Sequence, residues 1–352
     1  MDFVSERINN LEPYTAGEQI NSIIKLNTNE NPYPPSPEVY KAIKEYDAGL
    51  LRLYPDQYST ALIKTVAEKH SVDKDMVFVG NGSDEILAFC WQAFFDEADE
   101  KIAYPDITYS FYPVYSNLYK VQSVVIPVNE DFQIDLSAYN GLAVKGIILA
   151  NPNAPTSLAI KANELTAYVK SNSDKLVIVD EAYIDFSDES VISYVGDYDN
   201  LLVIRTLSKG YSLAGLRCGY AVGNSKLIAG LNKIKNSFNN YPVDSLAQIA
   251  ATAALKDAAY YGEINAKVVN TRERISAALR NMGFRVLKSE SNFLFITHNL
   301  YQAKDLYLKL KSERILVRYF NKPKINNYLR ISVGTDADMD TLLDKISMII
   351  NA

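Results

Sequence analysis

The stretch LLVIRTLSKGYSLAGLRCGYAVG, residues 201–223, decides the fold. Two apolar runs, LLVIRT at 201–206 and CGYAVG at 218–223, flank a polar segment that carries Lys209 and Arg217. Continuous apolar runs of this length are typical of strands buried on both faces of a mostly parallel sheet. Lys209 then lies at the edge of a core, where it is either a solvated turn residue or a residue held there for chemistry.

Runs of the same kind recur along the chain and alternate with helical patterns. Strands are predicted at DMVFVG (75–80), VQSVVIPV (121–128), GIILA (146–150) and LVIVD (176–180). Helices are predicted at SDEILAFCWQAFF (83–95), with Ser83 as the N-cap, and at NELTAYVKSN (163–172). This alternation predicts an α/β fold whose central sheet is mostly parallel and flanked by helices.

The last part of the chain follows a different pattern. Residues 242–282 are Ala-rich and helical, and three strand patterns follow: FLFI (293–296), ILVRYF (315–320) and YLRISVG (328–334). Helical segments lie between and after these strands, which is typical of a smaller α+β unit.

The length of 352 residues exceeds one typical domain, so two are expected. A large domain is predicted at 46–260 and a small α+β domain at 261–352. Residues 1–45 are predicted to form an N-terminal arm and part of the small domain.

Composition excludes several classes of protein. A net charge of −6 argues against a partner nucleic acid or membrane surface. Cys90 and Cys218 are the only cysteines, so neither a disulfide framework nor a metal site is expected. The N-terminal sequence lacks signal-peptide character, and no apolar run reaches the ~18 residues of a membrane span. A soluble cytoplasmic protein is expected.

Polar side chains follow several of these predicted strands, and ligands of α/β sheets bind outside the carboxyl ends of the strands. VFVGNGSDEI, residues 77–86, is strand, Gly-rich turn and helix, and the free amides of such a turn suit an anion. Glu85 replaces the third glycine of the dinucleotide-binding pattern, however, and a plain capped turn explains the motif equally well. Asp180 ends a buried strand, where a helix cap or structural ion pair is the ordinary explanation.

Asn153 and Tyr109 also have ordinary explanations, because Asn is common in turns and Tyr109 is one of 25 tyrosines. The order of the residues changes this interpretation. Pyridoxal 5′-phosphate needs a lysine for a Schiff base, an acid for its pyridine nitrogen, an aromatic ring for its face, and an arginine with a helix N-terminus for its phosphate. The chain supplies all of these at successive strand ends.

At this point the sequence resembles the fold-type I pyridoxal-phosphate aminotransferases, and within them the histidinol-phosphate aminotransferases. The resemblance covers nearly the whole chain. It is carried, in the family's order, by KLNTNENPYPPSP, GNGSDE, NPNAPT, VDEAYIDF, RTLSKGYSLAGLRCGY and LRISVG.

The resemblance implies a role for each matching residue around the cofactor. Lys209 would form the Schiff base and move the proton of the reaction. Asp180 would pair with the pyridinium nitrogen, Asn153 and Tyr183 would hydrogen-bond the phenolic oxygen, and Tyr109 would stack on the ring. Because this lysine must lose its proton to react, its pKa is expected below the usual value, lowered by Arg217 and partial burial.

The resemblance also implies two anion sites. The cofactor phosphate would be held by Gly82, Ser83, Asp84, Thr206, Ser208 and Arg217, with Tyr54 reaching in from the neighbouring subunit of a homodimer. The substrate would be bound by Tyr14, Asn29, Arg318 and Arg330. The family commonly has Asn and Gly where this chain has Ala154 and Ser157, so the turn after Asn153 is expected to differ in shape, and it commonly has a Gly at Pro34.

The implied reaction is transamination of histidinol phosphate with 2-oxoglutarate, giving imidazole-acetol phosphate and glutamate by ping-pong kinetics, as in histidine biosynthesis. An aromatic amino-acid aminotransferase or a phosphothreonine-type decarboxylase of the same fold would share every cofactor residue. A transcription regulator with an aminotransferase-like domain would need an added DNA-binding region. A non-catalytic protein of this fold would be expected to have lost Lys209 or Asp180.

Overall fold

The structure is a computed structural model that describes residues 3–20, 23–95 and 100–351. The helices described are α1 (Glu6–Asn9), α2 (Pro37–Glu45), α3 (Thr60–His70), α4 (Gly82–Phe94), α5 (Phe111–Tyr119), α6 (Ala162–Ser171), α7 (Ser225–Phe238), α8 (Ser245–Lys256), α9 (Ala258–Asn281), α10 (Ala303–Ser312) and α11 (Asp336–Ile350). The strands are β1 (Ile24–Lys25), β2 (Val77–Gly80), β3 (Lys101–Pro105), β4 (Gln122–Ile126), β5 (Gly146–Ala150), β6 (Leu176–Asp180), β7 (Leu201–Thr206), β8 (Gly219–Gly223), β9 (Arg285–Val286), β10 (Phe293–Thr297), β11 (Ile315–Leu316), β12 (Arg318–Tyr319) and β13 (Leu329–Ser332). Short 3-10 helices include η1 (Ala48–Arg52), η4 (Ile184–Phe186) and η6 (Ala214–Leu216).

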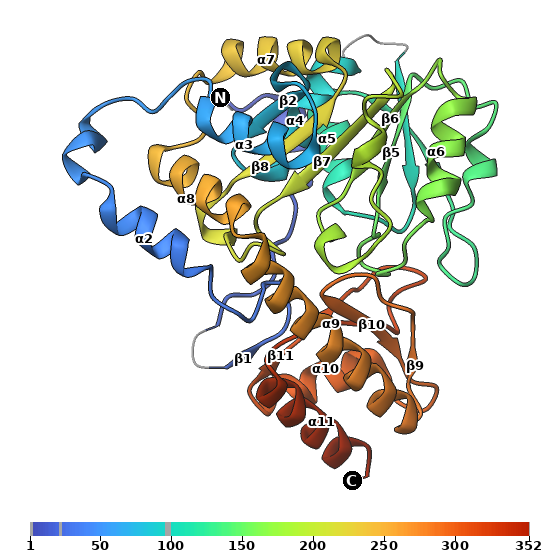
Figure 1. The fold of residues 1–352 in the computed structure, drawn as a ribbon. Coiled ribbons are helices and arrows are strands. Elements are labelled where there is room, and N and C mark those ends of the chain that lie inside the picture. Colours follow the sequence, from blue (N-terminus) through green and yellow to red (C-terminus); the bar gives the residue numbers. More distant parts are fainter. Residues whose placement is uncertain (1–2, 21–22, 96–99, 352) are drawn as a thin grey trace.

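A seven-stranded sheet forms the centre of the larger part of the molecule (Figure 1), in the order β2-β8-β7-β6-β5-β3-β4. β8 is antiparallel to both of its neighbours, and the other pairs are parallel. The predicted mostly parallel sheet is therefore confirmed. The sequence analysis missed β3, because its apolar centre is short and lies between a lysine and a proline.

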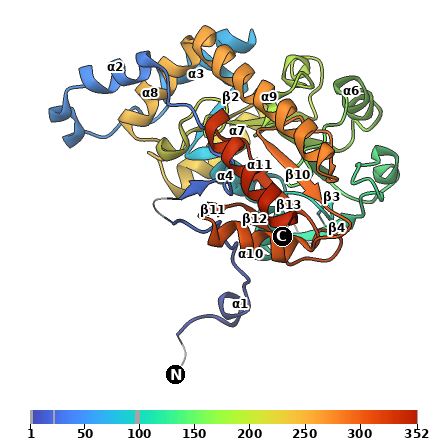
Figure 2. The ribbon, with the colours of Figure 1, turned by 90° about the horizontal axis from the view of Figure 1, so that it is seen from below.

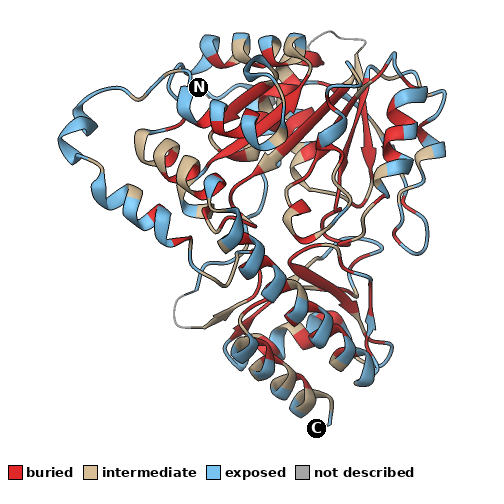
Figure 3. Ribbon diagram, in the orientation of Figure 1, coloured by how far each residue is buried: buried red, intermediate tan, exposed pale blue. Residues whose placement is uncertain are grey.

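Alternate residues of the central strands enter two separate hydrophobic clusters, one on each face of the sheet. Val177, Val179, Leu201 and Val203 belong to one cluster, and Ile178, Leu202 and Ile204 belong to the other. All of these side chains are fully buried, which explains why the strands lack a polar alternation. Figure 3 shows the buried sheet between helices that are exposed on their outer sides.

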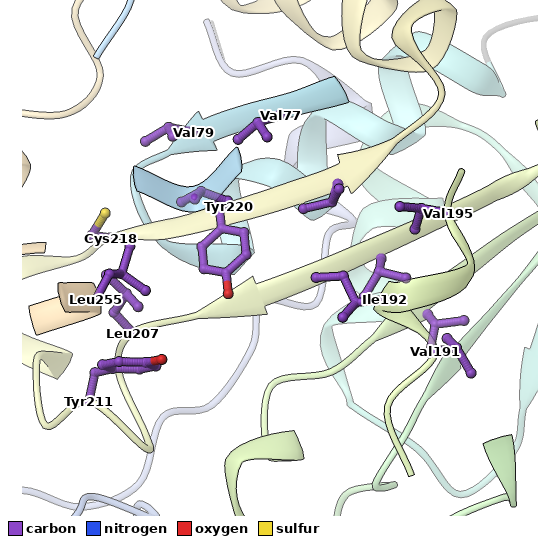
Figure 4. Close-up of a cluster of buried hydrophobic side chains, with 14 of the residues drawn as sticks. Val77, Val79, Val191, Ile192, Val195, Leu207, Tyr211, Cys218, Tyr220 and Leu255 are labelled. Carbon is purple, nitrogen blue, oxygen red and sulfur yellow. The ribbon is translucent and has the colours of Figure 1, made fainter. Parts of the chain in front are cut away.

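Figure 4 shows part of the first cluster, where Val77 and Val79 of β2 lie beside Tyr220 of β8. Leu207 and Tyr211, from the segment that follows β7, belong to the same cluster. The segment that carries Lys209 is thus anchored on both sides of this lysine by buried apolar side chains.

The C-terminal part contains an antiparallel sheet in the order β12-β13-β10-β9. Helices α9, α10 and α11 pack beside it, and the long α9 begins near the central sheet and ends at this smaller one (Figures 1 and 2). The predicted strand ILVRYF is divided: β11 pairs with β1, and β12 pairs with β13. In the described part of the chain, no helix combines the length and apolar character needed to cross a membrane.

Candidate active site

A cavity opens at the carboxyl ends of three parallel strands. Ala150, Asp180 and Thr206, the last residues of β5, β6 and β7, all line it. The N-terminal segment, the start of α4, the segments that follow these strands and the C-terminal sheet supply the remaining walls. This is the location at which α/β sheets bind ligands.

Most of the predicted site residues line this cavity together. These are Tyr14, Asn29, Ser83, Asp84, Tyr109, Asp180, Tyr183, Thr206, Ser208, Lys209, Arg217, Arg318 and Arg330. Three predicted residues, Gly82, Asn153 and Tyr54, do not line it. Gly82 nevertheless adjoins the site, because a Cβ built on it would lie 2.7 Å from Nη2 of Arg217.

Lys209 points into the cavity from the segment between β7 and η6. Its Nζ donates a hydrogen bond to the carbonyl oxygen of Thr28 at 3.1 Å and lies 5.8 Å from the ring centre of Tyr183. Burial lowers the pKa of Lys209 to about 8, with Arg330 as the next contributor and Arg217 a smaller one. The predicted lowering of the Lys209 pKa is confirmed, although Arg330 contributes more to it than Arg217, the residue expected from the sequence.

Asp180 is a buried carboxylate at the end of β6. Its Oδ2 accepts a hydrogen bond from the hydroxyl of Tyr112 at 2.9 Å, and its Oδ1 accepts one from the amide of Ala182 at 3.2 Å. Burial raises the pKa of Asp180 to about 7, while the Tyr112 hydrogen bond lowers it. Tyr112 was not identified from the sequence, where it is one of 25 tyrosines.

Hydrogen-bond donors gather around the N-terminus of α4. The Arg217 guanidinium pairs with Oδ2 of Asp84 at 3.1 Å and donates to Oγ of Ser208 at 3.3 Å. Thr206 Oγ1 donates to the same Ser208 oxygen at 2.9 Å, and Tyr109 donates to Oδ1 of Asp84 at 2.8 Å. Hydroxyls, a guanidinium and a helix N-terminus at one end of a cavity can hold an anion. The helix begins at Gly82, with Asn81 as N-cap, so the predicted cap at Ser83 was wrong by two residues.

A second cationic group comes from the C-terminal sheet. Arg318 of β12 and Arg330 of β13 are partners in the antiparallel register. Arg330 Nη2 donates to the carbonyl of Asn27 at 2.9 Å, whereas its buried Nε has no hydrogen-bond partner within the described residues. Arg318 donates to the carbonyls of Thr15 and Ala16 and so fixes the N-terminal segment beside the cavity.

That segment places Tyr14 at the cavity wall, where its ring stacks on Phe111 with the ring centres 4.4 Å apart. Asn29 is buried, and its Nδ2 donates to the Tyr183 hydroxyl at 3.0 Å. The Asn29 Oδ1 accepts from the hydroxyl of Ser332 at 3.0 Å. Both side-chain atoms of Asn29 are therefore bonded within the protein, and they connect β13 to Tyr183.

Asn153 lies behind the cavity wall rather than in it. Its Nδ2 donates to the carbonyl of Ile107 at 2.9 Å and to Oγ1 of Thr156 at 3.0 Å. A contact between this amide and a ligand would require one of these bonds to be released. Ser157, where glycine is common in the family, has a φ of 65°, a conformation that favours glycine, so the turn keeps a glycine-like backbone.

Tyr54 lies on the surface between η1 and α3. Its side chain is 81% exposed and stacks on Tyr241 with the ring centres 4.6 Å apart. Within this chain it does not reach the cavity.

Solved structures share this fold over nearly the whole chain. A histidinol-phosphate aminotransferase from Sinorhizobium meliloti, in complex with pyridoxal-5′-phosphate, matches with a TM-score of 0.89 at 24% identity and covers 100% of this chain and 98% of its own. An L-threonine-O-3-phosphate decarboxylase from Porphyromonas gingivalis matches with a TM-score of 0.80 at 23% identity, and the match covers 94% of this chain and 100% of the decarboxylase chain. The fold alone therefore does not separate the two activities.

Sequence comparison is more specific. The family "Aminotransferase class I and II" matches residues 21–346. Histidinol-phosphate aminotransferases from Brachyspira hyodysenteriae and from Clostridium botulinum (strain Okra) are 51% and 50% identical, covering 99% and 97% of both chains in each comparison. The chain therefore belongs to the class I and II aminotransferases and, within them, to the histidinol-phosphate aminotransferase family.

Proposed function

We propose that this chain is the cytoplasmic, homodimeric enzyme that transfers the amino group of histidinol phosphate to 2-oxoglutarate, with pyridoxal 5′-phosphate as cofactor. The products are imidazole-acetol phosphate and glutamate. Relatives of about 50% identity carry the name of this activity over nearly their full length. The observation that carries the proposal is one cavity with two cationic groups, Arg217 at the end of α4 and the pair Arg318 and Arg330. Such a cavity suits a phosphorylated cofactor together with an anionic substrate.

The donor set fits the cofactor. Bound pyridoxal phosphate supplies an aldehyde that condenses with amines and a ring that withdraws electrons. Asp180 is buried and forms no ion pair within the described residues, so it is free to take a cationic ring nitrogen as its partner. Ser83, Thr206, Ser208 and Arg217 would hold the phosphate. Tyr109 would cover the ring, and Tyr183 would donate to the phenolic oxygen, with Asn153 behind it.

Lys209 is the residue proposed to carry the cofactor and the proton. With a pKa of about 8, a substantial fraction of its Nζ is neutral near pH 7.5, as a nucleophile or base must be. When its Nζ is free, it would accept the proton of the substrate's α-carbon and deliver it to C4′ of the cofactor, and the second half-reaction would run this transfer in reverse. Its bond to the Thr28 carbonyl keeps the amine oriented toward the cavity.

The substrate anion is assigned to Arg330 and Arg318, with Tyr14 and Asn29 beside them. The unpaired Nε of Arg330 is the supporting observation, because a buried donor without a partner is costly unless a ligand satisfies it. The N–H groups of a guanidinium can donate paired hydrogen bonds either to a phosphate or to a carboxylate, so one site would bind both substrates in turn.

The decisive experiment is an amino-donor panel with purified, pyridoxal-phosphate-loaded protein. The panel contains histidinol phosphate, histidinol, phenylalanine, tyrosine and O-phosphothreonine, with 2-oxoglutarate as acceptor. We expect histidinol phosphate to be preferred and glutamate to form. Release of carbon dioxide from O-phosphothreonine, or equal rates with histidinol, would contradict the proposal. Borohydride reduction should fix the cofactor on the peptide that contains Lys209, and fixation on another lysine would refute its role.

A further inference from the structure

Asp180 receives its side-chain hydrogen bond from one neutral residue, Tyr112. Among the described residues no lysine or arginine forms an ion pair with this carboxylate, and the only other donor is the backbone amide of Ala182. The neighbouring acids Asp84 and Glu181 both favour its neutral form, as does its burial. The charged form of Asp180 therefore depends on very few groups.

The hydroxyl of Tyr112 is held in a fixed place. Tyr112 lies in α5 with no exposed surface. Its ring centre is 5.9 Å from that of Trp91, 6.0 Å from that of Tyr104 and 5.7 Å from that of Tyr109, the last at an edge-to-face angle of 86°. Neighbouring rings on several sides leave the phenol little freedom to turn away from Asp180.

Tyr112 also stays a donor. Burial and the adjacent Asp180 raise the pKa of its phenol well above the usual value, so the hydroxyl keeps its proton at any pH at which the enzyme would work. A hydroxyl that cannot ionise, aimed at a carboxylate 2.9 Å away, favours the charged state of that carboxylate.

We propose that Tyr112 is a positioning residue that holds the Asp180 carboxylate ionised and turned toward the ring nitrogen of the cofactor. Through its edge-to-face contact with Tyr109, the same side chain also braces the ring that faces the cavity. This inference rests on the proposed role of Asp180, and the experiment below separates the two.

The chemical consequence concerns one proton. An ionised Asp180 keeps the pyridine nitrogen protonated, whereas a neutral carboxyl cannot stabilise that positive charge. If the Tyr112 hydroxyl is removed, the proton of the ring nitrogen is held less firmly, and the ring withdraws electrons less well. The effect should be visible in the resting enzyme before any substrate is added.

The test uses three variants of the loaded dimer: Tyr112→Phe, Tyr104→Phe and Asp180→Asn. Tyr104→Phe is the matched control, because it removes a hydroxyl from the same aromatic cluster whose bond goes to Ser123 rather than to Asp180. Each protein is reconstituted with pyridoxal phosphate labelled with ¹⁵N in the ring, and the ¹⁵N chemical shift is recorded across pH. This shift reports protonation of the ring nitrogen independently of turnover.

For Tyr112→Phe we expect the ¹⁵N shift to move toward that of the neutral pyridine at a lower pH than in wild type, together with an approximately 10-fold lower kcat. Tyr104→Phe should keep the wild-type shift. Asp180→Asn should show the neutral-pyridine shift throughout and lose at least about 100-fold in kcat. Incorporation of 3-fluorotyrosine at position 112, which keeps the hydroxyl and makes it a stronger donor, should hold the ring proton to a higher pH than in wild type.

The outcomes separate the two ideas. A wild-type ¹⁵N shift in Asp180→Asn would refute the role of Asp180 itself. A normal shift in Tyr112→Phe, beside a changed one in Asp180→Asn, would overturn the inference about Tyr112 alone. If Tyr112→Phe does not fold, the fluorotyrosine protein decides, because a stronger phenolic acid should hold the ring proton to a higher pH than wild type, and no change would contradict the inference.

Discussion

Lys209 lies in a cavity that also contains Arg217, Arg318 and Arg330. Burial and the guanidinium groups of Arg330 and Arg217 disfavour its charged form, and the carboxylates of Glu30 and Asp84 oppose them. Without a cofactor, a lysine in this setting destabilises the folded chain. In the unfolded chain the lysine is protonated in water at no cost, whereas in the folded chain its charge is buried. The lowered pKa that the proposed role of Lys209 requires is therefore also a source of instability.

This instability has a predictable pH dependence. The pKa of Lys209 is about 8 in the folded chain and 10.5 in the unfolded one, so between these values the unfolded state binds more protons. The lowered pKa reduces the free energy of unfolding by up to about 3 kcal/mol, at 1.36 kcal/mol per unit of pKa difference. This loss is complete below pH 8 and disappears as the pH rises toward 10.5. We expect cofactor-free Lys209→Met to be more stable than wild type at pH 7.5. The difference in free energy of unfolding should shrink at pH 10, and a constant difference would contradict the prediction.

A second prediction at this scale concerns the unpaired Nε of Arg330. Arg330→Ala should raise KM for histidinol phosphate and for 2-oxoglutarate by about 10-fold to 100-fold each, since a charge-assisted hydrogen bond is lost in both half-reactions. Arg285→Ala is the control, because Arg285 is paired with Asp131 outside the cavity. Steady-state kinetics, with the concentration of each substrate varied in turn, would measure the two KM values. An effect on one substrate alone would mean that the two anions use different sites.

Residues at strand ends were the ones that the sequence could predict. Asp180 follows an unbroken apolar run, and Lys209 follows another, so their placement at one edge of the sheet follows from the parallel topology. Tyr112 and the Thr28 carbonyl could not be predicted in the same way. Their roles depend on contacts between segments far apart in the chain, and one tyrosine among 25 carries no distinguishing pattern.

At the scale of elements, the N-terminus of α4 is positioned by close backbone contact with β8. A Cβ built on Gly219, the first residue of β8, would lie 2.8 Å from the amide of Ser83 and 2.9 Å from the carbonyl of Arg205. Both are backbone atoms that cannot move aside easily. The glycine thus allows the donor-rich turn to approach the end of β7.

Gly219→Ala should therefore affect both stability and the anion site. We expect a loss of about 1–3 kcal/mol in stability, as for other overpacked sites, and weaker retention of pyridoxal phosphate, because the Ser83 amide must shift. Gly215→Ala, where a Cβ meets nothing within 4 Å, should leave retention unchanged. Denaturant unfolding and fluorescence titration with the cofactor would measure the two effects. Normal cofactor affinity in Gly219→Ala would argue against Ser83 as a phosphate contact.

The strand predicted at 315–320 shows what the sequence could not supply at this scale. Its apolar pattern was read correctly as extended chain, but Ile315–Leu316 pairs with β1 and Arg318–Tyr319 pairs with β13. An apolar run identifies a strand but not its partner. Pairing is decided by the N-terminal segment that crosses beside it, which lies almost 300 positions earlier in the chain.

At the scale of the whole molecule, apolar side chains remain exposed along one connected stretch. The stretch runs through η1 and the residues after it, where the exposed fractions are 43% for Leu50, 56% for Leu51 and 50% for Leu53. Tyr54 and Tyr58 have larger exposed fractions than these leucines. Together with the outer side of α2 they stand at one edge of the molecule (Figure 1). A second copy of the chain would cover such a surface, which supports the proposed homodimer.

If Tyr54 acts in the neighbouring active site, two inactive variants should complement each other. Tyr54→Ala and Lys209→Ala, unfolded and refolded together, form mixed dimers in which one of two sites is intact. Random pairing then gives at most roughly a quarter of wild-type activity. Lys209→Ala with Asp180→Ala is the control, because both residues belong to the same subunit's site and no intact site can arise. Activity no higher than the mean of the parents, in a sample shown to contain mixed dimers, would mean that Tyr54 serves its own subunit or none.

The domain boundaries at residues 45 and 260 stay predictions. The region from 242 to 282 was read as helical, and it forms α8 and α9. The second of these begins at Ala258, close to the predicted boundary, and continues into the C-terminal part. A helix that continues from one part into the other gives the sequence no linker to mark the division, and its one glycine, Gly262, lies inside the helix.

The walls of the cavity come from both ends of the chain, from Tyr14 to Arg330. A ribosome delivers these walls in order, so Lys209 and the donors around α4 emerge long before β13. Until β13 has been made, Asn29 lacks its bond to Ser332, and the anion site of Arg330 does not exist. Until then Lys209 also lacks the nearby guanidinium of Arg330, the second-largest contribution to its lowered pKa after burial. The lowered pKa that the proposed role of Lys209 requires is therefore complete only once β13 has brought Arg330 to the cavity.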